Sequence, residues 1–210
     1  MTKNCANQGN DTNETNRIIS AKAQGYRELL RPLVEKVLVF EPTMLASGVM
    51  SNFYFDGKLV TLQGRGANYL AHYILEQIPL DSYDAIGGLT MGADPIASAV
   101  CAMSLEKGSP KDAFYVRKTQ KEHGRKKRIE GPLAAGSRVI VVDDVATSGG
   151  SIMEAVRAVE EDMNCIVVMV LAFVDRQQGA REFFESNGYV FDSVFTAEEL
   201  GVPLEDIKRS

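Results

Sequence analysis

The first third of the chain shows helical spacing of apolar residues on both sides of an alternating segment. In residues 16–39 the apolar positions recur three and four apart, which predicts an amphipathic helix despite Pro32, a residue type able to kink it. Residues 66–77 have the same spacing. Between them, "SNFYFDGKLVTL" (51–62) alternates around Asp56-Gly57, a dipeptide typical of hairpin turns. We therefore predict a helix, a hairpin and a second helix.

The remainder repeats a short apolar strand followed by a helix. The predicted pairs are "YDAIGG" (83–88) with "DPIASAVCAMSLEK" (94–107), "DAFYVRK" (112–118) with a charged loop, and "RVIVVDD" (138–144) with "GGSIMEAVRAVEED" (149–162). "CIVVMVLAFVDR" (165–176), "AREFFESNG" (180–188) and "YVFDSVFT" (189–196) continue as strand, helix and strand. Strands that alternate with helices form parallel sheets. The predicted fold is α/β, a mostly parallel sheet flanked by helices with a small N-terminal helix-plus-hairpin element.

Length, charge and cysteine content narrow the class of protein. A chain of 210 residues suits one domain, which we place at 16–210 behind a polar, flexible tail at 1–15. A net charge of −5 argues against nucleic-acid binding, and no apolar run is long enough for a membrane span. The three cysteines, Cys5, Cys101 and Cys165, are widely spaced and lack CxxC or His partners. A reducing, cytoplasmic location without a disulfide framework or structural zinc is expected.

The segment "RVIVVDDVATSGGS" (138–151) carries the strongest chemical signal. Ligands of open α/β sheets lie at the carboxyl ends of strands, where Asp143 and Asp144 are predicted to stand. The small, hydroxyl-bearing residues 145–151 then offer backbone N–H groups to a phosphate at the start of a helix. Two carboxylates suit the vicinal hydroxyls of a ribose. A helix cap with bound solvent explains Asp143 and Asp144 equally well, whereas a Walker-B site lacks the GxxxxGK[ST] partner.

Three further segments offer candidate ligand contacts. "FYVRKTQKEHGRKKRIEG" (114–131) concentrates positive charge that suits a diphosphate under a closing loop, although a solvated charged loop is the better explanation for residues 125–128. In "GGLTMGADPIASA" (87–99), residues 90–93 offer amides to a second phosphate, and Asp94 is predicted to cap the helix. Arg176 ends a buried strand and suits either a planar anion or an ion pair with Asp175 or Glu182.

Taken together, these segments resemble the type I phosphoribosyltransferase family, and within it the orotate branch. "VIVVDDVATSGGS" (139–151) is similar to that family's signature for phosphoribosyl diphosphate (PRPP). "VRKTQKEHG" (116–124) with "IEG" resembles the flexible loop of the orotate branch, "LASGVMSNFYFDGK" (45–58) its N-terminal hood, and "VDR" (174–176) its orotate-side strand end. The resemblance spans residues 45–181 and rests on several motifs at once. It implies the type I fold, with a hood at about 16–62.

The resemblance also implies a reaction and a set of site residues. The reaction would transfer the phosphoribosyl group of PRPP to orotate, giving orotidine 5′-monophosphate and diphosphate in pyrimidine (UMP) biosynthesis. The implied PRPP contacts are Arg117, Lys118, Lys121, His123, Asp143, Asp144, Val145, Ala146, Thr147, Ser148, Gly149, Gly150 and Ser151. Thr147 and Arg176 would contact orotate, and Lys121 and Asp144 would act in catalysis.

Metal use and assembly follow from the same resemblance. Mg²⁺ would be bound mainly through PRPP and water, with no protein metal site, because this ion keeps several waters and substrate oxygens as ligands. A homodimer would share its active sites, Lys121 reaching into the partner's. Two alternatives stay open: a phosphoribosyltransferase for another base, and a PRPP-sensing regulator without turnover, for which the sequence offers no DNA-binding element.

Overall fold

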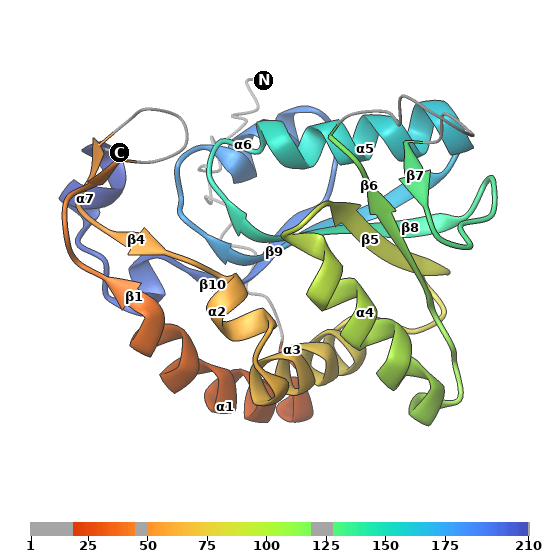
Figure 1. Ribbon diagram of the computed structural model, residues 1–210, viewed down its shortest axis with the longest axis horizontal. Coiled ribbons are helices and arrows are strands. Elements are labelled where there is room, and N and C mark those ends of the chain that lie inside the picture. The colour runs from red at the N-terminus through yellow and green to blue at the C-terminus, as the bar shows by residue number, and fades with distance from the viewer. Residues whose placement is uncertain (1–18, 45–49, 119–127, 210) are drawn as a thin grey trace, which may run out of the picture.

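A computed structural model describes residues 19–44, 50–118 and 128–209, and its centre is a six-stranded sheet. The strands are β5 (Ala85–Leu89), β6 (Asp112–Val116), β7 (Ile129–Glu130), β8 (Arg138–Ala146), β9 (Ile166–Asp175) and β10 (Phe191–Thr196), arranged in the order β10-β9-β8-β5-β6-β7. All neighbouring pairs are parallel except β6 with β7 (Figure 1). The predicted α/β class with a mostly parallel sheet is confirmed.

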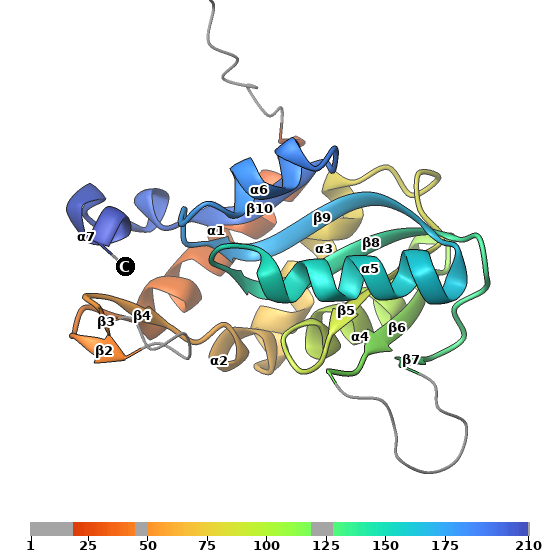
Figure 2. The same cartoon turned by 90° about the horizontal axis from the view of Figure 1, so that it is seen from above.

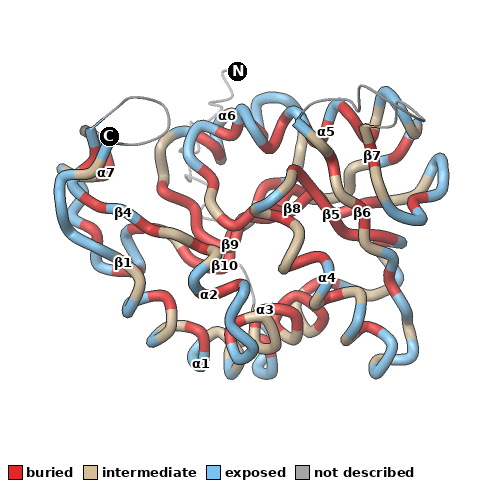
Figure 3. Tube along the Cα trace, in the orientation of Figure 1, coloured by how far each residue is buried: buried red, intermediate tan, exposed pale blue. Residues whose placement is uncertain are grey.

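Helices cover both faces of the sheet because its strands are apolar on both sides. Along β8, Ile140 and Val142 belong to the core shared with α1 (Ala21–Val37), α3 (Gly64–Gln77) and α4 (Ala93–Ser104). Val139 and Val141 point into the opposite core, beneath α5 (Gly150–Met163) and α6 (Ala180–Ser186). Such uninterrupted burial is typical of central parallel strands. Figure 3 shows the buried strands between two more exposed layers of helices.

The predicted helix at 16–39 is present as α1, and a local contact sets its N-terminal end. Ser20 caps it by accepting a hydrogen bond at Oγ from the backbone N–H of Ala23, at 3.1 Å. Pro32 lies inside the helix without ending it. Residues 1–18, which include the predicted tail and Cys5, lie outside the described residues.

The predicted hairpin at 51–62 is wrong. Strand β4 (Tyr54–Phe55) pairs antiparallel with β1 (Leu38–Val39), and the helix α2 (Lys58–Thr61) begins directly after Asp56-Gly57. The Asp56 carboxylate accepts a hydrogen bond from the Lys58 N–H at 3.1 Å, so this dipeptide starts a helix and does not turn a hairpin. A second short ladder joins β2 (Thr43–Met44) to β3 (Met50–Ser51).

The C-terminal segment packs against these N-terminal strands. After β10 come the 3₁₀ turn η2 (Glu198–Leu200) and the helix α7 (Leu204–Arg209), and Ala197, Val202 and Ile207 form a small core with Phe53. Figure 2 shows β2, β3, β4 and α7 at the same end of the molecule. The sequence patterns did not predict this packing.

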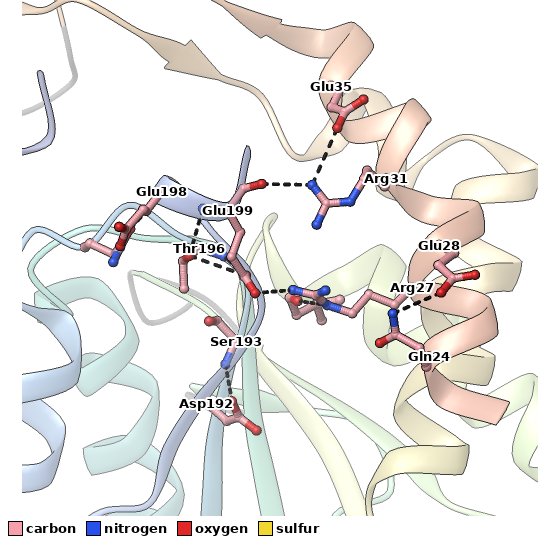
Figure 4. A network of polar contacts seen from close by, with 12 residues as sticks. Gln24, Arg27, Glu28, Arg31, Glu35, Asp192, Ser193, Thr196, Glu198 and Glu199 are labelled. Carbon is pink, nitrogen blue, oxygen red and sulfur yellow. Dashed lines mark hydrogen bonds and ion pairs between the residues drawn. The ribbon is translucent and has the colours of Figure 1, made fainter. Parts of the chain in front are cut away.

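A polar network fastens α1 to the sheet edge (Figure 4). Arg27 pairs with Glu199 at 2.6 Å and donates from Nε to the carbonyl of Val194 at 2.9 Å. Arg31 donates to the carbonyl of Glu199 at 2.8 Å.

The short turn η1 (Leu105–Lys107) closes α4. Within the described ranges, no helix combines the length and the hydropathy that a membrane span requires.

Candidate active site

A pocket of about 450 Å³ opens at the carboxyl ends of β5 and β8. This is the edge at which open α/β sheets bind ligands, because helix N-termini and loops converge there. Its walls are formed by Lys58, Leu89, Thr90, Met91, Gly92, Lys118, Asp143, Asp144, Val145 and Ser151. The pocket thus brings together residues from three of the segments singled out in the sequence, and adds Lys58.

Asp143 and Asp144 lie side by side in the pocket wall with side chains that are nearly buried. Their exposed fractions are 8% and 7%, and β8 continues past them to Ala146, two residues further than predicted. Burial raises the pKa of the Asp143 carboxyl well above its usual value, and the adjacent charge of Asp144 raises it further. Two crowded carboxylates of this kind are poised to accept hydrogen bonds from a polar ligand.

Two glycine backbones pack closely against the carboxylate pair. A Cβ on Gly92 would stand 1.9 Å from Oδ1 of Asp143, and one on Gly57 would stand 2.7 Å from Cβ of Asp144. A side chain at either position would force neighbouring atoms to move. At Gly57, then, glycine is required by close contact between chain segments and not by a hairpin turn.

Replacing Gly92 with alanine is expected to lower the melting temperature by about 2–10 °C, because overpacking of this size costs about 1–3 kcal/mol. Gly25→Ala is the matched control, since a Cβ on that helical glycine meets nothing within 4 Å. There alanine should raise the melting temperature slightly through its higher helix propensity. Thermal unfolding followed by circular dichroism measures both. Equal melting temperatures for the Gly92 variant and the wild type would contradict the packing described here.

Lys58 is a site residue that the sequence reasoning missed. Its ammonium lies 3.0 Å from Oδ2 of Asp144 and 3.0 Å from Oδ1 of Asp56. Burial opposes the charge on Lys58, but the hydrogen bond to Asp56 and the charge of Asp144 together raise its pKa above the usual value. The sequence signal available was a lone cation after "FDG", inside the segment predicted to form a hairpin.

The predicted phosphate loop, residues 145–151, forms the entry to α5. Gly149 has φ of +86° and immediately precedes the helix, a conformation that favours glycine. Thr147, Ser148, Gly150 and Ser151 are exposed, so their hydroxyl and amide groups face solvent at a helix N-terminus. This arrangement attracts an anionic group. Val145 and Ser151 also line the pocket.

Arg117 and Lys118, two of the described cations of the charged segment, differ in orientation. Lys118 lines the pocket, whereas Arg117 pairs through Nε with Glu130 on β7 at 2.9 Å and does not line it. Lys121, His123 and residues 125–127 lie outside the described residues. Arg128 donates to the carbonyl of Glu154 in α5 at 3.3 Å.

Arg176 is almost fully buried, at 2% exposure, beneath the N-terminal strands. It donates from Nη2 to Oγ of Ser51 at 2.8 Å, and its guanidinium stacks on the Phe53 ring at 4.0 Å. Among the described residues, Nε of Arg176 has no hydrogen-bond partner. No described carboxylate forms an ion pair with the Arg176 guanidinium either. The alternative of an ion pair with Asp175 or Glu182 is not observed. Burial lowers the pKa of Arg176 to about 10, so the side chain stays charged at neutral pH.

The prediction that Asp94 caps a helix is wrong. Gly92 holds the cap position and Asp94 lies in the first turn of α4, because the helix begins one residue earlier than Asp94. One carboxylate oxygen of Asp94 is buried without a described partner, and burial raises the pKa of this group. The N–H of Thr90, expected to be free for a phosphate, donates to the carbonyl of Val116 at 2.9 Å.

Comparisons with known proteins agree on one family. Residues 74–192 match the phosphoribosyl transferase domain. The chain is 44% identical over 158 residues to the orotate phosphoribosyltransferase of Synechocystis sp., covering 75% of this chain and 79% of that protein. The chain is also 46% identical over 160 residues to the orotate phosphoribosyltransferase of Bradyrhizobium diazoefficiens, a match that covers 74% of this chain and 85% of that protein.

A solved structure extends the likeness to three dimensions. The crystal structure of Mycobacterium tuberculosis orotate phosphoribosyltransferase in complex with PRPP superimposes with a TM-score of 0.68 at 33% identity. The match covers 88% of this chain and 99% of that one. At this identity the likeness concerns sequence as well as fold.

Proposed function

The chain belongs to the phosphoribosyl transferase family, among the orotate phosphoribosyltransferases, and on this premise we propose how its residues carry out the reaction. The enzyme transfers the phosphoribosyl group from PRPP to N1 of orotate, which gives orotidine 5′-monophosphate and diphosphate in pyrimidine biosynthesis. We assign the reacting centre to this pocket because the buried pair Asp143 and Asp144 lies in its wall.

In this proposal PRPP lies across the pocket with its sugar on the carboxylate pair. Asp143 and Asp144 accept hydrogen bonds from the ribose hydroxyls, while the 5′-phosphate rests on the exposed amides and hydroxyls of residues 145–151 at the start of α5. Lys118 faces the same pocket and suits the diphosphate. Lys121 and His123 complete the proposed PRPP contacts, together with Arg117, which would have to exchange its partner Glu130 for the ligand.

Orotate is proposed to meet Arg176, with Thr147 as a second contact. A buried guanidinium without a paired carboxylate is costly unless an anion completes its surroundings, and orotate supplies a carboxylate. Because Ser51 and Phe53 cover Arg176, the N-terminal strands must give way locally for the base to reach it.

The chemical step needs charge stabilisation more than proton transfer. The anomeric carbon develops positive character as the diphosphate leaves, so the negative charge of Asp144 near the sugar favours the transition state. Orotate is already an anion at neutral pH, which removes the need for a strong general base. Lys121 is proposed to stabilise the departing diphosphate from a loop that closes over the pocket and excludes water.

Mg²⁺ fits this pocket as an ion carried by its substrate. The wall offers oxygen donors, and the described residues contain no group of three or more His, Cys, Asp or Glu side chains able to enclose a metal. Mg²⁺ usually keeps waters and phosphate oxygens as ligands, so the residues that hold PRPP would hold the ion with it. When bound, the ion neutralises charge that builds on the leaving diphosphate.

The assembly and setting belong to the proposal as well. We propose one phosphoribosyltransferase domain at 16–210 with a hood at about 16–62, acting as a homodimer whose loops complete each other's sites. Cys101 and Cys165 are free thiols, which agrees with a reducing, cytoplasmic setting.

One assay tests the reaction. The purified protein with PRPP and Mg²⁺ should consume orotate, followed by the change in ultraviolet absorbance, and should leave adenine, hypoxanthine and uracil essentially unchanged. Turnover of a purine or of uracil in place of orotate would support the alternative base specificity. PRPP binding without turnover of any base would support the sensing regulator.

Asp144→Asn is expected to lower kcat/KM for PRPP by about 10-fold or more, because an amide still hydrogen-bonds but places no negative charge beside the developing cation. The melting temperature should change little. Steady-state kinetics with PRPP varied, together with thermal unfolding, separate the two roles. Unchanged kinetics with a lower melting temperature would make Asp144 a structural residue.

A further inference from the structure

Lys58 is placed in the pocket by contacts that tie it to the reacting centre. It comes from α2, at the junction between the hood strand β4 and α3, and is 86 residues away in sequence from the Asp144 carboxylate that it touches. The Gly57 backbone before it packs directly on Asp144. The position of Lys58 relative to Asp144 is therefore fixed by close packing on the backbone side.

The Lys58 ammonium is held by two carboxylates that come from different parts of the fold. Asp56 anchors it from the hood, since its Oδ1 accepts from the Lys58 backbone and also pairs with Nζ. Asp144 binds the same ammonium from the sheet, with Oδ2 at 3.0 Å. The Lys58 side chain is 39% exposed and faces the pocket, so a ligand can reach it.

This ion pair conflicts with the role proposed for Asp144. A cation in contact with Asp144 weakens the negative field that would stabilise a developing positive charge on the sugar. It also occupies one of the oxygens available to a ribose hydroxyl. The conflict disappears if the ammonium has a different partner once the substrate is bound.

PRPP brings such a partner, because its diphosphate is a stronger and more highly charged acceptor than one carboxylate. We propose that Lys58 is a substrate-binding residue whose ammonium stays on Asp56 but exchanges Asp144 for a diphosphate oxygen when PRPP enters. The exchange adds a cation to the leaving group and frees Asp144 for the ribose. This inference rests on the proposed function, and deepens it.

Lys58→Met tests the proposal, because methionine keeps most of the unbranched side chain and removes the charge. We expect binding of PRPP and of inorganic diphosphate, each with Mg²⁺ and measured by calorimetry, to weaken by about 10-fold or more. kcat should fall, and the KM for orotate should stay within about twofold of the wild type. Lys58→Arg, which keeps the charge, should recover most of the binding.

Lys107→Met is the matched control. Lys107 is also paired with a carboxylate, Glu76, but it lines a different surface cleft beside α1. This variant should leave kinetics and diphosphate binding unchanged. Melting temperatures of all variants show whether any loss reflects unfolding, and Lys58→Arg keeps the test informative if the methionine variant is unstable.

A double-mutant comparison separates substrate binding from neutralisation of Asp144. In an Asp144→Asn background, Lys58→Met should still weaken diphosphate binding. If its effect vanishes there, Lys58 is only a counter-ion for Asp144 and the proposal is overturned. Unchanged or tighter PRPP binding in Lys58→Met, or a rise confined to the KM for orotate, also overturns it. A wild-type protein that does not consume orotate would instead refute the proposed function.

Discussion

Arg176→Ala should lower kcat/KM for orotate by about 30- to 1,000-fold, corresponding to about 2–4 kcal/mol for the loss of a desolvated charge pair. The affinity for PRPP should change by less than about threefold. Arg176 lies at the end of β9, buried under Ser51 and Phe53, and does not line the pocket assigned to PRPP. Its loss therefore removes a partner for the base and leaves the sugar-phosphate contacts in place.

The matched control for this prediction is Arg181→Ala. Arg181, in α6, is partly exposed and packs over the ring of Phe191, so its removal should affect stability only. Uracil provides a second check because it lacks the carboxylate of orotate. Arg176→Ala should narrow the preference for orotate over uracil, whereas Arg181→Ala should preserve it. A loss of PRPP affinity as large as the loss for orotate would show that Arg176 serves the other substrate.

The sheet and the phosphate loop could be predicted because their signals are local. In β8 and β9, continuous runs of β-branched and other apolar residues report burial on both faces, and the loop after β8 is recognisable from its glycines and hydroxyls. Even there, the C-terminal end of β8 was predicted two residues too early. Val145 and Ala146 continue the ladder with β9, pairing with Val174 and Asp175, which the residue types alone do not reveal.

The hood could not be predicted in detail because its structure depends on distant segments. Alternation around Asp56-Gly57 suggests a hairpin, yet Tyr54 pairs with Val39, and Gly57 is needed for contact with Asp144. Phe53 packs on Ala197, Val202 and Ile207, a cluster that exists only once segments far apart in the sequence come together. A local pattern cannot distinguish a glycine that turns the chain from one that lets two segments touch.

The same limit applies to individual site residues. Lys58 reaches Asp144 across 86 positions of sequence, and Arg176 reaches Ser51 across 125. The local sequence assigned no role to Lys58 and left two competing kinds of partner open for Arg176. Only the fold removes Asp175 as a partner of Arg176, because Asp175 accepts the N–H of Gln177 at 2.8 Å instead.

Subunit complementation offers the second large effect. If Lys121 reaches into the partner's site, a Lys121→Ala chain and an Asp144→Ala chain should each be nearly inactive as homodimers. In a mixed dimer, one site receives the intact loop of one chain and the intact carboxylate pair of the other. The second site receives both defects. Each mixed dimer therefore regains one working site.

The described residues on either side of the loop that carries Lys121 give a physical reason for this prediction. Strand β6 ends at Val116, and of the two cations that follow, Lys118 lines the pocket of its own subunit while Arg117 is held by Glu130 at 2.9 Å. Among the described residues, Lys58 and Lys118 are the cations that line this pocket, and a multiply charged diphosphate can accept a further cation, which the Lys121 of a second subunit would supply. Lys121 itself lies outside the described residues, so a functional measurement is needed.

Mixing the two inactive variants under conditions of subunit exchange should restore about one quarter of wild-type activity, since random reassortment makes about half of the dimers mixed and each has one good site of two. Exchange is verified by native mass spectrometry of differently tagged chains. Two wild-type samples carried through the same exchange serve as the reference for full activity. Absence of recovery when exchange is demonstrated would place Lys121 in the site of its own subunit, because only an intact loop and an intact carboxylate pair from different chains can rebuild a shared site.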